Sequence, residues 1–233
     1  MFYEPRTETS GLPHSPFNSC CVPRPIGWIS TLSRDGVHNL APFSQFQNVT
    51  FDPPTVLFSS CGTPNTDTAR NVEETGEFVW NMATYEQRDA VARSAFEYPP
   101  NVDEFEELGI ETLPSNLVKP LRVAGSPVHF ECIVTHVIDV PGRVGKATCK
   151  LVIGEVVGIH IRDDAITPDG RLDVPRLKPL ARLGYLDYTY VDKRFELTGA
   201  GMETLFHNPE EEHGLAAVPE DRTIQHLDVG LRQ

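Results

Sequence analysis

Residues 23–44, Pro-Arg-Pro-Ile-Gly-Trp-Ile-Ser-Thr-Leu-Ser-Arg-Asp-Gly-Val-His-Asn-Leu-Ala-Pro-Phe-Ser, decide the fold of this chain. Two runs that suit β-strands, 26–33 and 37–44, flank Arg34-Asp35-Gly36, where Asp-Gly tolerates the positive φ that a hairpin turn needs. The second run ends in small and polar residues of little value for a core: Asn39, Ala41, Pro42 and Ser44. The sequence therefore predicts a β-hairpin whose far end faces something other than protein.

Most of the remaining chain also has the pattern of strands, which we expect at 55–60, 77–82, 128–140, 147–161 and 185–197. Residues 141–145 have the length and composition of a hairpin link. Helices are expected at 66–74 with Gly76 as its stop, at 85–96 with an apolar face of Val91, Ala92, Ala95 and Phe96, at 103–108 and at 174–183. About seven strands at hairpin spacing favour a mainly β protein, a closed antiparallel barrel with flanking helices.

The domain organisation follows from the same patterns. We expect an N-terminal extension at 1–19, one domain at 20–198, and a loosely attached tail at 199–233 that is rich in Glu, Pro, His and Gly. No G-x-G-x-x-G and no G-x-x-x-x-G-K-[ST] motif occurs, so the sequence supports neither a Rossmann nor a P-loop nucleotide site.

The composition excludes several classes of partner. The 233 residues carry a formal net charge of −13 with a pI near 5.0, which disfavours binding to nucleic-acid phosphates or anionic lipid. No apolar run approaches the roughly 20 residues that span a bilayer, and residues 1–16 are polar. Five cysteines without a C-x-x-C pair fit free thiols in a reducing compartment. We expect a soluble, cytoplasmic protein with a small-molecule or protein partner.

The strand at 55–60 and the helix that opens at Thr66 or Asp67 form a candidate anion site. A helix N-terminus presents unpaired N–H groups and the positive end of the helix dipole. The hydroxyls around it are those of Ser59, Ser60, Thr66 and Thr68, so a phosphate fits there. The alternative is that Thr66 or Asp67 is only an N-cap and the serines satisfy a turn.

The first hairpin offers a second set of polar atoms, from Ser30 and Thr31 on one strand and from Asn39 and the 41–44 backbone on the other. Pro42 has no N–H to donate to a ladder, so strand pairing is interrupted there and backbone groups become available to a ligand. A flat heterocycle with hydrogen-bonding edges suits them. The alternative is an edge strand that contains a proline.

The sequence pattern resembles a known family. P-R-P-I-G-W-I-S-T-x-x-x-D-G-x-x-N-L-A-P-F-S, then D-P-P, S-S, D-T-x-x-N and E-x-T-G-E-F-V, resembles the flavin reductase-like FMN-binding split-barrel family, close to its flavoredoxin and nitrilotriacetate monooxygenase component B branch. The resemblance continues through Tyr98-Pro99-Pro100, Asp103-Glu104-Phe105 and Gly154-Glu155-Val156-Val157 to about Leu197. It implies a homodimeric split barrel that holds FMN at the subunit interface.

The resemblance also implies which residues hold FMN. Ser30, Thr31, Asn39, Ala41, Pro42 and Ser44 would line the ribityl chain and the edge of the isoalloxazine ring, and Ser59, Ser60, Cys61, Thr66, Asp67, Thr68 and Asn71 would surround the phosphate and ribityl end. Two departures stand out. Thr66 occupies the place of a family lysine, so Arg70, Arg24 or the backbone has to replace that cation. Gln45 stands where an aromatic residue is common, next to the flavin.

Other candidates carry less chemistry. His129, Glu131, Cys132 and His136 suggest a metal site, but strand alternation puts the first two and the last two on opposite faces, so we expect no metal. His160 ends a strand, and by resemblance it lies near the flavin. Arg182, Tyr185 and Tyr188 lie where related reductases place residues that face the nicotinamide. A helix-end arginine or an ordinary strand-end histidine is the alternative.

The leading hypothesis is an NAD(P)H:FMN oxidoreductase that passes electrons to a partner monooxygenase or another acceptor. The flavin supplies the chemistry, and no side chain is expected to act as a nucleophile. The first alternative is an FMN-binding electron carrier without a nicotinamide site. A second is a split-barrel enzyme that acts directly on an organic substrate.

Overall fold

The computed structural model describes residues 1–61, 66–142, 147–197 and 225–228. Residues 62–65, most of the expected link at 141–145 and most of the tail at 199–233 lie outside the described residues. Among the described helices, none has the length and apolar character needed to cross a membrane.

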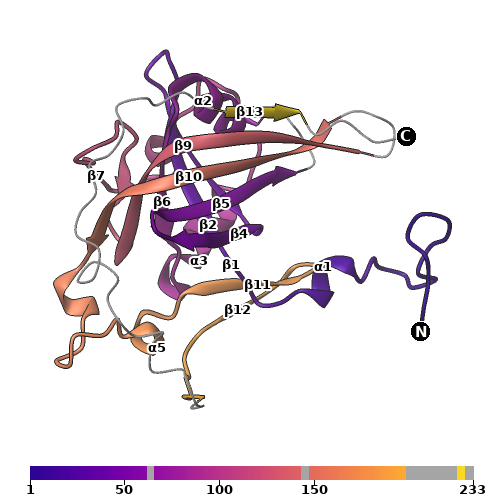
Figure 1. The fold of residues 1–233 in the computed structure, drawn as a ribbon. Helices are drawn as coiled ribbons and strands as arrows, with labels where there is room; N and C mark the ends of the chain where they lie inside the picture. The colour runs from indigo at the N-terminus through magenta and orange to yellow at the C-terminus, as the bar shows by residue number, and fades with distance from the viewer. Residues whose placement is uncertain (62–65, 143–146, 198–224, 229–233) are drawn as a thin grey trace.

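One antiparallel sheet dominates the structure. Its order is β3-β2-β6-β9-β10-β5-β4. These strands are β2 (Gly27–Leu32), β3 (His38–Phe43), β4 (Phe46–Phe51), β5 (Pro54–Cys61), β6 (Glu77–Met82), β9 (Val128–Pro141) and β10 (Ala147–Ile161). Figure 1 shows β9 and β10 crossing the molecule side by side as its longest strands. The mainly β fold and the first hairpin are confirmed, with Gly36 at φ +83° in its turn.

The two ends of this sheet meet at Ser44 and Gln45. β3 and β4 are the end strands of the order and are joined through these two residues. Gln45 O accepts a hydrogen bond from Ser59 N (2.9 Å), which ties the join to β5. β4 was missed in the sequence because only Phe46 of its six residues is buried, so it shows no alternating pattern.

The barrel interior is filled by large side chains. Phe58, Phe78 and Val152 are fully buried, and the Trp80 ring stacks on Phe46 at a centroid distance of 5.2 Å. Gly154 is required in β10 because a Cβ there would lie 2.4 Å from the Phe78 ring. The interior is therefore closed packing, and a ligand has to bind at the rim.

A second apolar cluster attaches the helices to the outside of the barrel. Trp28, Leu40, Val91 and Phe105 are buried in it. It holds α3 (Arg88–Arg93), which follows a 3₁₀ turn at Tyr85–Gln87, and α4 (Glu104–Leu108), whose cap Asp103 accepts from Phe105 N at 2.8 Å. α2 (Asp67–Thr75) packs against β2 and β3, and Gly76 closes it at φ +72°, as expected.

The prediction of one helix at 85–96 was wrong in its end and its face. The helix stops at Arg93, and Ala92, Ala95 and Phe96 are exposed. Ser94 is buried instead, because its hydroxyl accepts from the Trp28 indole N–H at 3.0 Å.

The prediction of a helix at 174–183 was also wrong. α5 covers only Val174–Leu177, because Lys178 adopts φ +49° and Pro179 follows. The next residues form β11 (Leu180–Gly184), which pairs with β1 (Arg24–Pro25) and β12 (Asp187–Tyr190). The strand expected at 185–197 is thus limited to β12, since Tyr185 sits in a turn at φ +47°.

Short elements complete the described chain. They are α1 (Phe17–Cys20), β7 (Thr112–Leu113), β8 (Arg122–Val123), the 3₁₀ turn Asp163–Ala165 and β13 (Gln225–Asp228). β13 pairs in parallel with β9, and Figure 1 draws it beside that strand.

Candidate functional site

A polar pocket lies where the ends of the main sheet meet. It has a volume of about 480 Å³ and is walled by the end of β3, the end of β5, the first turn of α2 and the segment from the end of α3 to α4. Ten of the thirteen residues expected to bind the cofactor line it: Asn39, Ala41, Pro42, Ser44, Ser59, Ser60, Cys61, Thr66, Asp67 and Thr68. The structure thus brings both predicted half-sites to one pocket.

The first turn of α2 forms the hydroxyl-rich end of the pocket. Thr66 caps the helix, with its hydroxyl accepting from Ala69 N at 3.2 Å and lying 2.9 Å from the Ser60 hydroxyl. The N–H groups before Ala69 in this turn are among the first four of the helix, which have no intrahelical acceptor. Thr66 is therefore an N-cap, and it still stands on the pocket wall, so the two interpretations of this segment are compatible.

The other three expected residues lie beneath the pocket. Ser30, Thr31 and Asn71 are buried and do not line it. The Asn71 amide donates to the Thr31 hydroxyl at 3.0 Å, and Ser30 donates to Leu121 O at 2.5 Å. A parallel bond joins Asn39 to Thr68 at 2.8 Å. The Asn71–Thr31 and Asn39–Thr68 bonds hold α2 on the hairpin, so Ser30, Thr31 and Asn71 lie behind the wall of the pocket and do not line it.

The wall opposite α2 was missed by the sequence reasoning. It consists of Ser94, Ala95, Phe96, Glu97, Tyr98, Pro100 and Glu104, which join α3 to α4. Their signal was present in the Tyr-Pro-Pro and Asp-Glu-Phe motifs, which were used only for the family resemblance. Phe96 is 66% exposed and offers an apolar surface at the pocket.

Glu104 brings a buried carboxyl group to this wall. It is 5% exposed, and its Oε2 accepts from Leu40 N of β3 at 3.0 Å. Burial, opposed by this backbone bond and aided by the charges of Asp67 and Asp103, raises its pKa to about 7. Close to neutral pH, Glu104 therefore exists in both protonation states.

Of the two candidate replacements for the family lysine, only Arg70 lines the pocket. Its guanidinium is hydrogen-bonded to Asp67, so a carboxylate already offsets much of its charge. The Arg24 guanidinium donates to the carbonyl oxygens of Ser44 (3.1 Å), Cys21 (2.6 Å) and Asn18. Arg24 thus supports the end of β3 from outside the pocket, and Arg70 is the candidate cation that stands on the pocket wall beside α2.

The residues expected near the nicotinamide are engaged elsewhere. His160 bonds Glu131 at 2.5 Å, and Glu131 is fully buried while accepting from the backbone N–H groups of residues 116–118. Arg182 bonds the Tyr188 hydroxyl (2.5 Å), lies over the Tyr188 ring at 4.5 Å and donates to Tyr185 O. None of them lines the 480 Å³ pocket of the same chain.

The metal candidates have separate roles. Nε2 of His129 donates to Val123 O at 2.8 Å, and burial lowers the pKa of this histidine to about 4. Glu131 holds the loop described above, and Cys132 is buried in the barrel. Within the described ranges, no group of three or more His, Cys, Asp or Glu side chains could hold a metal ion.

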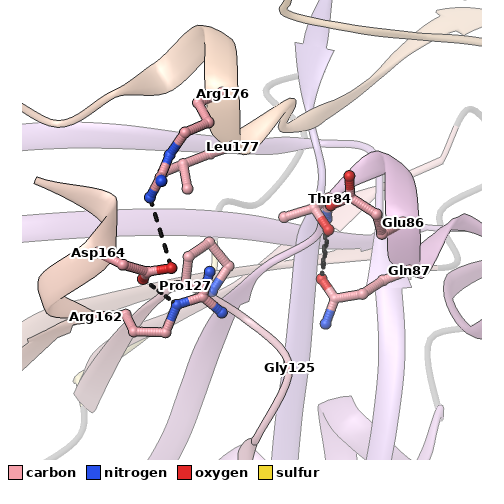
Figure 2. A pocket seen from close by; sticks show the side chains of 9 residues that line it. All are labelled: Thr84, Glu86, Gln87, Gly125, Pro127, Arg162, Asp164, Arg176 and Leu177. Atoms are coloured by element: carbon pink, nitrogen blue, oxygen red, sulfur yellow. Dashed lines mark hydrogen bonds and ion pairs between the residues drawn. The ribbon is translucent and has the colours of Figure 1, made fainter.

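A second pocket, of about 430 Å³, lies between α5, the turn at Thr84 and the end of β10. Figure 2 shows Arg162 and Arg176 converging on Asp164. Arg176 lies 3.6 Å from Asp164 and 3.7 Å from Asp173, so both arginines are offset by carboxylates. The hydrogen bond from Arg162 lowers the pKa of Asp164. These contacts hold the α5 segment together and leave no excess positive charge for an anion.

An antiparallel barrel with a ligand pocket at the seam of its sheet is the architecture of the split-barrel flavoproteins. Residues 19–194 match the family model described as flavin reductase like domain, and the chain belongs to that family. An uncharacterized protein of Halalkalibacterium halodurans is 37% identical over 180 residues, which are 76% of this chain and 85% of that protein.

Two solved structures illustrate the likeness. Nitrilotriacetate monooxygenase component B from Bacillus cereus has a TM-score of 0.78 and 28% identity, covering 84% of this chain and 98% of that one. The Pseudomonas fluorescens 2-nitrobenzoate 2-nitroreductase has a TM-score of 0.74 and 25% identity, covering 86% and 97%. The sequence-based identification of the family is confirmed.

The pocket fits the parts of an FMN molecule. Hydroxyls and a helix N-terminus suit its phosphate, while Pro42, Phe43 and Phe96 offer apolar surface to a flat ring. The Asn71 amide oxygen, buried just below the wall, has no hydrogen-bond partner in the described structure. The volume lies within the about 300–1,000 Å³ of small-molecule sites.

Proposed function

We propose that this protein holds FMN in the 480 Å³ pocket and acts as an NAD(P)H-dependent flavin reductase that hands electrons to a monooxygenase or another acceptor. The observation that carries the proposal is the convergence of the hairpin end and the α2 N-terminus on one pocket. When bound, FMN supplies a carrier that accepts a hydride from NADH or NADPH and releases electrons onward.

The side chains of the pocket bind and orient the cofactor in this proposal. The first turn of α2, with Ser60 and Thr66, holds the phosphate. The β3 end at Ala41 and Pro42 contacts the ring edge, and Phe96 covers part of the pocket from water. Asn39 and Thr68 keep the two halves at a fixed separation through their hydrogen bond.

The relatives support a reductase role. The Bacillus cereus neighbour is named as a monooxygenase component, and this chain covers 98% of it. A component B implies at least one further component of that monooxygenase, so we propose a partner monooxygenase or another acceptor for this chain.

The test has two stages. Purified protein should be yellow and should retain flavin through gel filtration. Stopped-flow mixing with NADH and NADPH should then bleach the visible flavin absorbance with at least one nucleotide. Bleaching by dithionite but by neither nucleotide would overturn the reductase assignment.

One observation favours a second candidate, an FMN electron carrier without its own nicotinamide site. His160, Arg182 and Tyr188 are bonded to other groups away from the pocket. The same stopped-flow experiment separates the two functions, because a carrier would be reduced by dithionite or a reduced partner only.

We also propose that the protein is a homodimer. The outer side of β4 is exposed, including Phe51 at 78%, and the β11–β12 turn exposes Leu186 at 89%. Exposed apolar strands of this kind are unusual on a monomer. Sedimentation equilibrium should give twice the chain mass of 25.9 kDa, and Phe51→Glu should shift the protein toward monomer.

A further inference from the structure

Cys61 and Cys149 are direct cross-strand partners. The antiparallel register of β5 and β10 places Cys149 opposite Cys61 and Leu151 opposite Ser59. Directly opposed residues project from the same face, with Cα atoms about 4.5–5.5 Å apart. A disulfide requires Cα atoms about 4.4–6.8 Å apart. The backbone of these two strands therefore already meets that requirement.

The two thiols also interact. Both cysteines are free, with Cys61 exposed and Cys149 half-buried. Burial, together with the hydrogen bond and charge of Cys61, raises the pKa of Cys149 to about 12, while a hydrogen bond from Ser59 acts in the opposite direction. Cys61 is therefore the accessible member of the pair, and it stands on the wall of the pocket.

The other three cysteines cannot form an equivalent pair. Cys20 and Cys21 are adjacent, so their Cα atoms lie about 3.8 Å apart, below the usual disulfide range. Cys132 is 0% exposed in the barrel interior, where burial raises its thiol pKa. Cys61 and Cys149 are thus the pair that the fold preorganises.

We propose that Cys61 and Cys149 are a reversible oxidation site, a dithiol on the pocket wall that closes to a disulfide on reaction with a small-molecule disulfide. The Cys61 thiolate attacks one sulfur of that molecule, forming a mixed disulfide and releasing one thiolate, which takes up a proton. Cys149 then loses its proton and attacks the Cys61 sulfur, expelling the second thiol. Two protein thiols are oxidised, and one disulfide is reduced to two thiols.

Closure would change the pocket at its phosphate end. Cys61 is the last residue of β5, and Ser59 and Ser60 just before it line the same wall. A disulfide to β10 fixes that strand end and removes the Cys61 thiol from the wall. An effect on FMN affinity rests on the proposed function, whereas formation of the disulfide does not.

The experiment uses the full chain with oxidised glutathione as the probe. After oxidation, free thiols are alkylated and peptides are mapped by mass spectrometry without reduction. We expect a linked peptide pair carrying Cys61 and Cys149 within one chain, which dithiothreitol opens again. Cys149→Ser should stop at the mixed disulfide on Cys61. Cys61→Ser should give no link, and its Cys149 should react with oxidised glutathione at least tenfold more slowly than Cys61 of the wild type does. A Cys20→Ser/Cys21→Ser variant is the matched control and should link like the wild type.

Two results would overturn the proposal. One is a wild-type protein that keeps the mixed disulfide on Cys61 and an alkylatable Cys149. The other is a link that forms only between chains or with Cys20 or Cys21. Peptide mapping of wild-type protein decides between these outcomes even if a variant folds poorly. Measuring FMN binding to both redox forms then shows separately whether the cofactor responds.

Discussion

Two buried glutamates in this protein meet opposite electrostatic environments. Glu131 on β9 is 0% exposed and accepts from the backbone N–H groups of Asn116 (2.8 Å), Leu117 (2.6 Å) and Val118 (3.1 Å), and from His160 (2.5 Å). Glu104 on α4 is 5% exposed and accepts a hydrogen bond from Leu40 N on β3. Both carboxyl groups fix a backbone segment, but only Glu104 faces the ligand pocket.

The difference shows that the number of donors, more than burial, decides the state of a buried carboxyl group. Burial tends to raise the pKa of Glu131, but the bonds from Asn116, His160, Leu117 and Val118 outweigh it and the pKa is lowered. For Glu104, burial prevails and the pKa rises to about 7. The donors around Glu131 therefore favour its charged form, which anchors the loop at 116–118, and Glu104 is a group that titrates in the pocket.

The largest effect should come from removing the charge of Glu131. Glu131→Gln puts an amide N–H₂ group opposite donors that now share one carboxylate, so at least one buried donor loses its acceptor. We expect a loss of about 3–5 kcal/mol in the free energy of unfolding, measured by urea denaturation at neutral pH. Glu77→Gln is the control and should cost less than about 1.5 kcal/mol, because one exposed backbone donor, Lys119 N, faces Glu77 and the amide oxygen can still accept from it. Equal losses in the two variants would show that the buried hydrogen bonds to Glu131 stabilise the protein no more than the surface bond to Glu77 does.

Glu104 should give the next effect, and it should depend on pH. Its pKa is raised from 4.5 to about 7 on folding, so the folded chain binds the proton more tightly. The resulting stabilisation is fully present below about pH 4.5 and is lost as the pH rises through about 7. The neutral Glu104→Gln variant lacks this dependence. The difference in unfolding free energy between the two proteins should change by on the order of 3 kcal/mol from about pH 4.5 to pH 8.

Glu107→Gln on the exposed side of the same helix is the control for this titration. It should follow the wild-type pH profile, because Glu107 is exposed and contributes no charge effect at Glu104. Identical profiles for wild type and Glu104→Gln would contradict a raised pKa at Glu104 and remove the contrast with Glu131.

The sequence predicted the walls of the pocket that β3, β5 and α2 form, but not the wall between α3 and α4 that contains Glu104. Local signals were sufficient for the Asp35-Gly36 turn and the Thr66 cap, because each depends on residues close in the chain. The expected interruption of pairing at Pro42 was wrong, because β2 and β3 keep one register through Pro42, which lies opposite Trp28. The role of Glu104 depends on α4 packing against β3, and its partner Leu40 lies 64 positions away. A contact of that separation leaves no periodic pattern in a single sequence.

The bonded partners of the expected nicotinamide residues are likewise distant or invisible in a single sequence. His160 has the position of an active-site histidine at a strand end, but its partner Glu131 lies 29 positions earlier on β9. Arg182 was placed at a helix end, whereas it lies in β11 and bonds Tyr188 across the β11–β12 pair. His160 and Arg182 are residue types that bind anions, but within this chain their side chains are bonded to Glu131 and Tyr188.

His160 therefore tests the Glu131 cluster more gently. His160→Gln keeps a donor near Glu131 but loses the imidazole ring, so we expect a loss of about 1–2 kcal/mol in unfolding free energy. If a nicotinamide nucleotide reduces FMN, the rate of reduction should stay within about twofold of wild type, because His160 lies away from the pocket. A twofold change in rate corresponds to less than about 0.5 kcal/mol in activation free energy. A large loss of rate with unchanged stability would move His160 from the cluster to the nucleotide site.

The smallest effect concerns the second carboxylate of the pocket, Asp67. It bonds Arg70 and also helps to raise the pKa of Glu104. Asp67→Asn should release the Arg70 guanidinium and remove an anion from the phosphate end, so FMN should bind roughly fivefold more tightly, about 1 kcal/mol. Riboflavin lacks the phosphate, and its affinity should stay unchanged. The midpoint of the Glu104 titration should fall in the same variant, because a like charge is lost. Weaker binding of both flavins would show instead that the Asp67 carboxylate contacts the ring or ribityl chain that FMN and riboflavin share. Flavin binding would then depend on the carboxyl groups of Asp67 and Glu104, and not on the hydroxyls and the helix N-terminus that we propose.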